Sequence, residues 1–476
     1  MSKPPSAKWW GWGWEGKTYD LANRPGFWPY LTDRLGLANQ PACPRVDLET
    51  IRLPASRLDD GILSGLAAIV GAANVHSDDY ARLTHAMGKS YRDLVRIRRG
   101  YVPHPPDAVV FPADTQQVKA VLELADCERL AVVPFGGGSS VVGGVEGLAG
   151  SCHAVICLDT ARLKRVLGVD ATSRTVRVQA GISGPALEDD LNRRGYTLGH
   201  YPQSFEFSCL GGWIATRSAG HASTFYGKIE DMVESLRLDT PTGPVEILPV
   251  PASAAGPDLK QLIIGSEGVL GVITEATLRV QLLPAAMEYQ AFMFHSFGDG
   301  LACVRQLMQQ DVTPATVRLS DAAETEMLFK LLEHKPGASP DLKTRLGQWL
   351  LARGGYRLGA ACFMILGYEG NREHVRAQWA RASAVCKQHN AFGLGHGPAY
   401  TWRRDRYELP YLRDVLLDRG VLVDTLETAT TWDNLASLHG KLLVAIAEAT
   451  TKTGSPPLVM AHVSHAYPDG ASLYFT

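Results

Sequence analysis

The sequence lacks any apolar run of the length that a bilayer-spanning helix requires, about 20 residues. Its first six residues, Met1 to Ser6, include two prolines and a lysine, and no apolar signal core follows them. A secretory leader would need such a core. We therefore expect a cytoplasmic protein with no signal peptide or transmembrane segment, and we allow for association with a membrane surface.

The sequence also lacks an excess of charge of either sign. Its 47 lysines and arginines nearly balance 49 acidic residues, for a formal net charge of -2. A nucleic-acid-binding protein normally carries a basic face, so we expect no nucleic-acid partner. The eight cysteines include no CxxC pair, which favours reduced thiols over a disulfide framework and predicts no metal site.

Glycine, in contrast, is concentrated where it carries information. A strand-like stretch, Leu130 to Val133, leads directly into the glycine run Gly136 to Gly138 and two serines. Such a loop leaves backbone N–H groups open to a pyrophosphate, although an isolated glycine run is more often a plain turn. This first segment comprises Pro134, Phe135, Gly136, Gly137, Gly138, Ser139 and Ser140.

Two further glycine-marked segments support a cofactor-binding interpretation of the first. The second comprises Gln203, Ser204, Phe205, Glu206, Phe207, Ser208 and Cys209, continued by Thr216, Arg217, Ser218 and Ala219. The third comprises Glu267, Gly268, Val269, Leu270, Gly271, Val272 and Ile273. We predict that all three bind the same cofactor.

Short strands interleaved with helices predict an α+β fold rather than a doubly wound sheet. Asp114 is placed to cap a helix whose apolar positions Val118, Val121, Leu122 and Ala125 recur at helical spacing. We expect an aromatic and helical segment at 1–100 that packs on the core, a cofactor domain at 101–284 and a substrate domain at 285–476. The basic run Arg92 to Arg99 is interpreted as a solvated face.

The three segments together resemble the vanillyl-alcohol-oxidase type of FAD-binding fold, also called the PCMH type. The alkyldihydroxyacetonephosphate synthase branch of that family resembles this chain over nearly its whole length. The motifs that carry this likeness include Trp9 to Gly13, Tyr226 to Asp231, Pro314 to Leu319, Tyr411 to Asp414 and Ala471 to Phe475. The resemblance implies a two-subdomain FAD-binding fold followed by an α+β cap domain.

The resemblance also implies an activity, namely exchange of the acyl chain of acyl-dihydroxyacetone phosphate for a fatty alcohol. This is a step of ether lipid synthesis with no net redox change, in which the flavin holds the substrate through its N5 atom. The implied cofactor is FAD, and nothing near His153, His200 or His221 requires covalent attachment, so we predict dissociable FAD. Lipid small molecules are the implied partners, with peripheral membrane contact and a homodimer both allowed for.

Four residues match functional positions of that family. Arg413 corresponds to the arginine that binds the substrate phosphate, and without the resemblance we would interpret it as a surface arginine. Arg318 matches another important arginine, with an ordinary strand-end ion pair as an equal alternative. Tyr474 matches the acid/base tyrosine and would need a cationic or histidine neighbour, because its ordinary pKa is about 10. His200 matches a histidine near the active centre, although a lone histidine in such a turn is more often structural.

The chain departs from the family pattern at two places. It ends at Thr476, where the resembled enzymes continue through a run of histidines, so we expect a truncated C-terminal end in which Tyr474 lacks its usual partners. Cys209 stands where the family commonly has threonine, and a thiol is a weaker hydrogen-bond donor. His462 and His465 are the histidines nearest in sequence that could replace the missing ones.

Two other functions stay open at this point. The first is oxidation of a 2-hydroxy acid such as D-lactate or glycolate, which would use the same FAD segments. The second is an inactive flavoprotein remnant, which the early end of the chain would explain.

Overall fold

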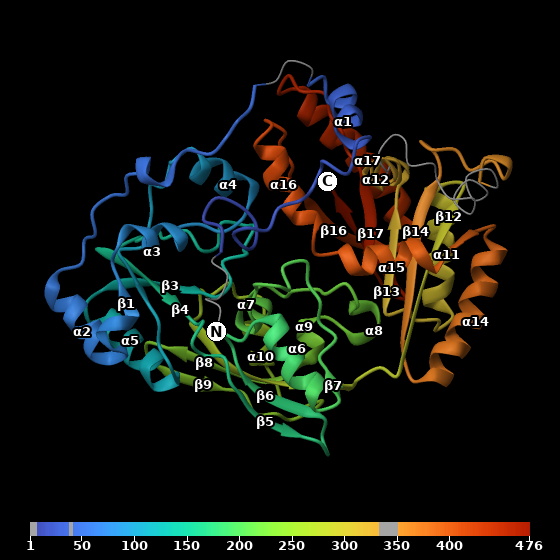
Figure 1. The fold of residues 1–476 in the computed structure, drawn as a ribbon. Coiled ribbons are helices and arrows are strands. Elements are labelled where there is room, and N and C mark those ends of the chain that lie inside the picture. Colours follow the sequence, from blue (N-terminus) through green and yellow to red (C-terminus); the bar gives the residue numbers. More distant parts are fainter. Residues whose placement is uncertain (1–6, 38–40, 333–350) are drawn as a thin grey trace. The chain divides into compact units, whose positions relative to one another are not determined.

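The computed structural model describes residues 7–37, 41–332 and 351–476. The chain forms two compact units, and both are discontinuous in sequence. The first unit contains residues up to Lys17, then Cys43–Gly220 and Gly227–Leu283. The second contains Thr18–Ala42, His221–Tyr226 and Pro284–Thr476. Figure 1 shows the elements of both units, which are described separately below.

The first unit contains a four-stranded sheet in the order β1-β2-β4-β3. Its strands are β1 (Val75–His76), β2 (Ala108–Val110), β3 (Leu130–Phe135) and β4 (Ala154–Asp159), with β3 and β4 parallel. Helices α2 (Asp60–Val70) and α5 (Thr115–Cys127) bury their apolar faces with this sheet. The Asp114 carboxylate accepts a hydrogen bond from the Gln117 amide, which confirms the predicted cap. The predicted apolar positions of α5 are all buried.

A second, antiparallel sheet completes the first unit, in the order β5-β6-β10-β8-β9. Its strands are β5 (Val166–Asp170), β6 (Thr175–Gln179), β8 (Val233–Thr240), β9 (Gly243–Glu246) and β10 (Val272–Arg279). The helices and the small ribbon of this unit are α3 (Asp79–Thr84), α4 (Tyr91–Arg98), α6 (Gly184–Arg193), α7 (Leu210–Ala215), α9 (Ile229–Met232), α10 (Leu259–Ile263), β7 (Tyr196–Thr197) and β11 (Gln281–Leu282). The first unit thus contains two sheets, in keeping with the two subdomains that the resemblance implies.

The N-terminal aromatic cluster packs on the first unit. Trp9 is buried with Ile51, Leu83 and Met87, and the edge of the Trp12 ring meets Phe207 at a centroid distance of 5.0 Å. The predicted solvated face of the basic run is wrong at Arg98, which is only 5% exposed. α4 turns Arg98 inward with Leu94 and Ile97, and its Nη1 donates to the Trp10 carbonyl.

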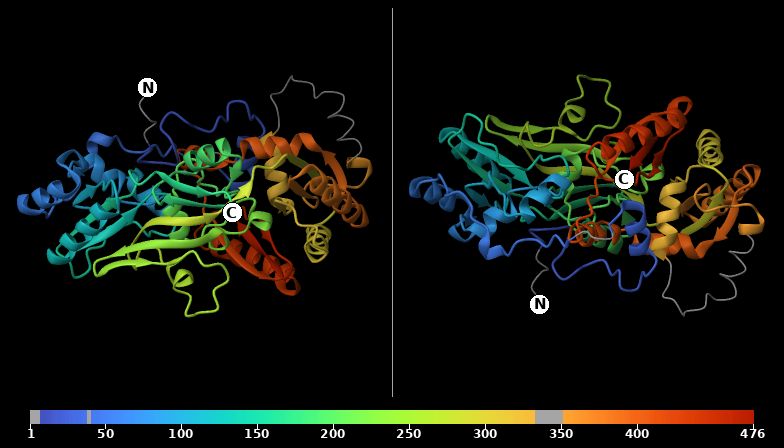
Figure 2. Two further views of the ribbon diagram at one scale, coloured as in Figure 1. Left: turned by 90° about the horizontal axis from the view of Figure 1, so that it is seen from below. Right: turned by 90° about the horizontal axis from the view of Figure 1, so that it is seen from above.

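The second unit is built on a seven-stranded sheet in the order β15-β12-β14-β13-β17-β18-β16. The strands are β12 (Ala286–Phe294), β13 (Thr316–Ser320), β14 (Cys362–Gly370), β15 (Phe392–Gly395), β16 (Leu426–Thr431), β17 (Ala461–Ala466) and β18 (Gly470–Phe475). The helices are α1 (Phe27–Leu35), α8 (Ser223–Tyr226), α11 (Phe297–Gln309), α12 (Ala322–Leu332), α14 (Arg372–Gln388), α15 (His396–Asp405), α16 (Leu409–Leu417) and α17 (Trp432–Thr451). The sheet and its flanking helices can be followed in Figures 1 and 2.

The two faces of this sheet carry different residues. Val317, Leu319, Val463, Leu473 and Phe475 enter one core together with side chains of α11, α14 and α17. Because side chains alternate along a strand, Arg318, His462 and Tyr474 project from the opposite face. Strand alternation thus gathers on one face three polar side chains that lie far apart in sequence.

No helix in the described part of the chain is long and apolar enough to cross a membrane. All eight cysteines have free thiols, and five of them are buried.

Candidate functional site

The three glycine-marked segments meet in the first unit. A Cβ on Gly136 would collide with Sγ of Cys209, and one on Gly137 would collide with the Phe207 carbonyl. A Cβ on Gly268 would lie 3.3 Å from Cγ of Pro134. The glycines therefore allow backbone segments more than 60 residues apart to touch. The structure brings the predicted cofactor segments together.

The backbone of the first segment presents open donors. Within the described residues, the amides of Gly138, Ser139, Ser140 and Val141 donate to no protein acceptor. Native proteins pair nearly all of their buried amides, and Gly138 is buried, so its open amide calls for a partner from outside the protein. Successive free N–H groups in a turn form a concave anion site, which fits the pyrophosphate of FAD.

Apolar side chains beside these segments are exposed. Val142 is 72% exposed and Val269 is 82% exposed, and Val141 and Leu270 are also open. Exposed aliphatic side chains next to an anion cradle match what an aromatic cofactor ring with a phosphate tail requires. The residues present therefore fit FAD.

Cys209 lies at the centre of this region and is buried. Burial raises the pKa of its thiol, against the opposing effect of the amides of Gly212 and Gly137. The group is therefore a neutral thiol at physiological pH. The sulfur lies against Gly136 of the glycine loop.

Several other predicted cofactor residues are engaged within the protein. The Glu206 carboxylate pairs with Lys17 Nζ at 2.9 Å, and Ser208 Oγ accepts from Trp213 Nε1 at 2.7 Å. Arg217 Nη2 donates to Gln261 Oε1 at 3.2 Å. These contacts fix the shape of the second segment, and direct cofactor contact by these side chains stays a prediction.

His200 belongs to the first unit, whereas Arg318, Arg413 and Tyr474 belong to the second. The His200 residue is only 1% exposed, and its ring lies against Trp213 at a centroid distance of 4.9 Å. Its Nε2 is 3.1 Å from Ser218 Oγ. His200 thus connects the second segment to its continuation, while a catalytic role for it stays a prediction.

In the second unit, Arg318 contacts Glu324 and His462. His462 was named from the sequence, but nothing in the sequence connected it with Arg318 or Glu324. Nη2 of Arg318 lies 2.8 Å from Glu324 Oε1, and its Nη1 lies 2.9 Å from His462 Nε2. The expected strand-end ion pair is therefore present. Burial would raise the pKa of Glu324, but Arg318 and His462 outweigh burial and hold that pKa well below its ordinary value.

Tyr474 lies beside this network. Strand pairing sets it opposite His462 on one side and Glu427 on the other, and its ring stacks on His462 with centroids 5.1 Å apart. Burial raises the pKa of the phenol, while Thr425, Arg318 and Arg413 act in the opposite direction. Tyr474 therefore has the histidine and cationic neighbours that an acid/base tyrosine needs.

Arg413 is carried by α16, which packs through Leu412 and Leu416 on Phe27 and Leu31 of α1. The Arg413 side chain is partly buried, not on the surface. Burial lowers the pKa of its guanidinium, and Asp414, Tyr474 and Asp424 oppose that shift. A guanidinium at this depth next to Tyr474 can bind an anionic group close to the tyrosine.

The short segment His221–Tyr226 also belongs to this unit and brings another histidine to the network. Ser223 Oγ lies 2.7 Å from His465 Nδ1, and Tyr226 donates to Glu369 at 2.9 Å. Burial holds the pKa of His221 well below its ordinary value, and Arg406, Arg318, His465 and His462 act in the same direction. No sequence pattern had connected His221 with Arg318.

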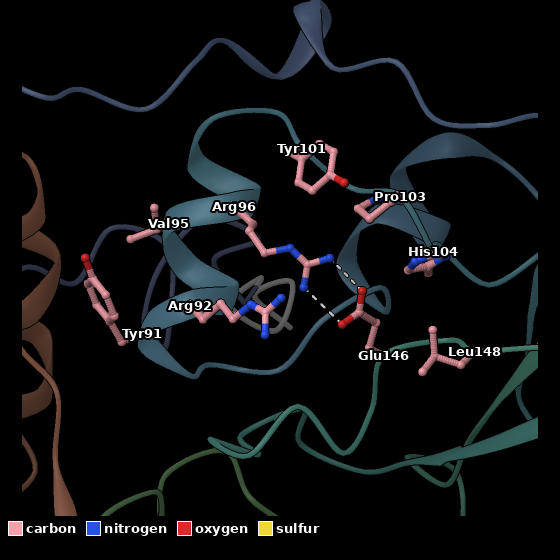
Figure 3. Close-up of a pocket in the computed structure, with 9 residues that line it drawn as sticks. All are labelled: Tyr91, Arg92, Val95, Arg96, Tyr101, Pro103, His104, Glu146 and Leu148. Carbon is pink, nitrogen blue, oxygen red and sulfur yellow. Dashed lines mark hydrogen bonds and ion pairs between the residues drawn. The ribbon is translucent and has the colours of Figure 1, made fainter.

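A separate cavity of about 570 Å³ lies in the first unit, and Figure 3 shows its walls. The Arg96 guanidinium holds the Glu146 carboxylate through two hydrogen bonds, at 3.0 and 2.7 Å. None of the predicted site residues lines this cavity. The remaining lining residues are Tyr91, Arg92, Val95, Tyr101, Pro103, His104 and Leu148.

Comparison with known families defines the class. A family model described as an FAD binding domain matches residues 106–248, and one described as the C-terminal domain of FAD linked oxidases matches residues 283–476. The chain is therefore an FAD-dependent flavoprotein with the predicted PCMH-type α+β fold. That result confirms both the fold class and the cofactor.

Two relatives identify the family. The alkyldihydroxyacetonephosphate synthase of Dictyostelium discoideum is 37% identical over 432 residues, which cover 91% of this chain and 70% of that protein. A solved structure of an alkyldihydroxyacetonephosphate synthase superposes with a TM-score of 0.89 at 34% identity, covering 98% of this chain and 90% of that one. The chain belongs to the alkyldihydroxyacetonephosphate synthase family.

The oxidase alternative has narrower support. The mitochondrial D-lactate dehydrogenase (cytochrome) of Arabidopsis thaliana is 34% identical over 223 residues, only 46% of this chain and 38% of that protein. The match to the synthase of Dictyostelium discoideum covers 91% of this chain, about twice as much.

Proposed function

We propose that this protein exchanges the acyl chain of acyl-dihydroxyacetone phosphate for a fatty alcohol. The family relationship supports this reaction, and the observation that carries it is that Arg413 and Tyr474, both in the second unit, lie close enough for each to shift the pKa of the other. An ester carbon–oxygen bond to the glycerone carbon breaks, and an ether bond to the alcohol oxygen forms. The fatty acid leaves as a carboxylate, and the alcohol proton passes to an acid/base group and then to solvent.

Arg413 binds the phosphate of the substrate in this proposal. A guanidinium forms two parallel hydrogen bonds to phosphate oxygens, which orient the substrate as well as hold it. Partial burial strengthens that attraction, because less water competes for the charge. The bound phosphate fixes the position of the glycerone carbons relative to Tyr474.

Tyr474 is the acid/base residue. Proton exchange at the carbon next to the ketone requires a group within hydrogen-bond reach that can both take and return a proton. The cations Arg318 and Arg413 favour the phenolate, whereas burial favours the phenol. Burial has the larger effect, so the phenol is the form present before substrate binds.

FAD, when bound, would supply an electrophilic ring system to this site. The open amides of Gly138 to Val141 would hold its pyrophosphate, and the exposed Val142 and Val269 would contact its apolar parts. We propose that FAD is dissociable. Release of all flavin into the supernatant on acid precipitation would support this, and yellow precipitated protein would contradict it.

The test is incorporation of isotopically labelled hexadecanol. The holoenzyme is incubated with palmitoyl-dihydroxyacetone phosphate, and we expect base-stable labelled ether lipid with one palmitate released per ether formed. Tyr474→Phe serves as the matched control. Ester product instead of ether, or no incorporation while D-lactate reduces the flavin, would overturn the proposal.

Long-chain substrates reside in membranes, so we further propose peripheral membrane contact of a cytoplasmic protein. Cosedimentation with vesicles containing fatty alcohol would show it, and complete recovery in the supernatant would contradict it. We also propose a homodimer, which sedimentation equilibrium tests directly.

A further inference from the structure

We infer that His462, in its neutral form with the proton on Nδ1, is a positioning residue that holds Arg318 beside Tyr474. A second proton on its ring would break the contact with Arg318 and switch the site off. The inference concerns regulation of the proposed site, so the activity part of its test rests on the proposed function. Its structural part does not.

The hydrogen-bond network favours one arrangement of protons. Arg318 can only donate, so the nitrogen that faces Nη1, Nε2 of His462 at 2.9 Å, must accept. The other ring nitrogen, Nδ1, lies 3.0 Å from Glu324 Oε1 and donates to it. Nη2 of Arg318 donates to the same carboxylate oxygen at 2.8 Å. It also lies 3.1 Å from Nδ1, but Nδ1 cannot accept from Nη2 while Nε2 accepts from Nη1, because a neutral imidazole has a single acceptor nitrogen. The histidine is therefore a neutral imidazole with its proton on Nδ1.

The strands impose this geometry on the ring. His462 pairs with Tyr474 across β17 and β18, and the rings stack at an interplanar angle of 28°. The His462 side chain is only 7% exposed and that of Glu324 only 5%. With little freedom to rotate, the imidazole fixes both the guanidinium and the phenol.

A second proton on the ring would change Nε2 from a hydrogen-bond acceptor into a donor. The nitrogen would then carry a hydrogen pointing at a cationic donor, and the Arg318 contact would become repulsive. Burial lowers the pKa of His462 and so does Arg318, while Glu324 opposes them. The charged form is therefore disfavoured at neutral pH.

The groups around the ring come from several elements. β13 contributes Arg318, α12 contributes Glu324, β18 contributes Tyr474 and β16 contributes Glu427. His221, from the segment before α8, is also close enough for His462 to affect its pKa. Glu427 and Glu324 favour the imidazolium, whereas Arg318 and burial oppose it. The pKa of His462 therefore depends on all of these groups.

The structural part of the test uses nuclear magnetic resonance of the FAD-loaded protein labelled at histidine. The His462 signals are assigned by their loss in His462→Gln. We expect a neutral Nδ1–H tautomer at pH 6.5 that titrates below the ordinary histidine value. An imidazolium at pH 6.5, or a proton on Nε2, would overturn the inference whether or not the protein catalyses exchange.

The activity part compares two variants. His462→Gln retains an oxygen that can accept from Arg318, whereas His462→Phe retains a stacked ring but neither hydrogen bond. We expect the acidic limb of the kcat profile to disappear in both variants, with kcat at pH 8 falling about tenfold more in His462→Phe than in His462→Gln. An acidic limb unchanged in both variants would overturn the inference. Absence of exchange by the wild-type protein would instead overturn the proposed function.

Discussion

Gly136 lies against Cys209 so closely that a Cβ on the glycine would collide with the sulfur. This contact joins the first cofactor segment to the second and sets the path of the loop whose amides are open. It predicts that Gly136→Ala weakens FAD binding at least tenfold, because the loop must shift to make room. FAD affinity is measured from the quenching of flavin fluorescence by the apoprotein.

A second substitution, Cys209→Ala, should restore the FAD affinity that Gly136→Ala loses. In Gly136→Ala/Cys209→Ala the sulfur is gone, and the new methyl group would lie 3.7 Å from Cβ of residue 209, an ordinary contact. We expect FAD affinity to recover to within about threefold of wild type. Gly168→Ala, with nothing within 4 Å, is the matched control and should leave affinity unchanged. Failure of the double variant to recover would contradict the packing account.

Arg413→Ala should chiefly raise KM. Loss of a charge-assisted contact to phosphate corresponds to about 1.5–3 kcal/mol, or roughly 10- to 100-fold. The decisive comparison uses acyl-dihydroxyacetone without the phosphate, for which wild type and Arg413→Ala should have similar KM. Equal losses on both substrates would show that Arg413 does not bind the phosphate.

Tyr474→Phe should chiefly lower kcat, by roughly 10²- to 10⁴-fold, with little change in KM. The conservative substitution retains the ring that stacks on His462, so its effect isolates the hydroxyl. Because burial raises the pKa of Tyr474 above its ordinary 10.0, the phenol stays protonated throughout the neutral range. The ultraviolet difference titration between wild type and variant should therefore show no phenolate below pH 10, and one near pH 8 would contradict the assignment.

Glu324→Gln should lower the free energy of unfolding by about 3 kcal/mol at pH 7, because it leaves Arg318 without its buried counter-charge. Glu326→Gln is the matched control on the same helix. Glu326 pairs with Arg34 at 2.8 Å, but that arginine side chain is 46% exposed, so its loss should cost less than about 1 kcal/mol. Urea denaturation monitored by tryptophan fluorescence gives both values.

The difference in unfolding free energy between wild type and Glu324→Gln should become smaller as the pH falls. Because the pKa of Glu324 lies below its ordinary 4.5, its stabilising contribution is complete above pH 4.5 and is lost as the pH falls further. The gap between wild type and Glu324→Gln should therefore shrink below pH 4.5. A gap that grew in acid would contradict the ion-pair assignment.

Local signals predicted much of the fold. The Asp114 cap and the apolar spacing of α5 depend on neighbouring residues, and both are found as predicted. The glycine segments were recognisable as runs in the sequence, although the close approaches that require glycine join distant segments. The family motifs then supplied Arg318, Arg413 and Tyr474, and the structure places all three in one unit.

Long-range packing could not be predicted in this way. The burial of Arg98 and the placement of His221 beside Arg318 depend on contacts between distant segments. The stacking of His462 on Tyr474 also depends on a shift in strand register. The pairs next to the turn, Ala466 with Ala471 and His465 with Ser472, would if continued set His462 opposite Phe475, and the shift between Val463 and His465 sets it opposite Tyr474 instead.

The most direct test of the central claim is an anaerobic absorbance spectrum of the FAD-loaded protein. Acyl-dihydroxyacetone phosphate should bleach the oxidised flavin bands with release of fatty acid, and fatty alcohol should restore them with formation of ether product. Addition of D-lactate should leave the spectrum unchanged. Bleaching by D-lactate, with no response to the acyl ester, would contradict the account.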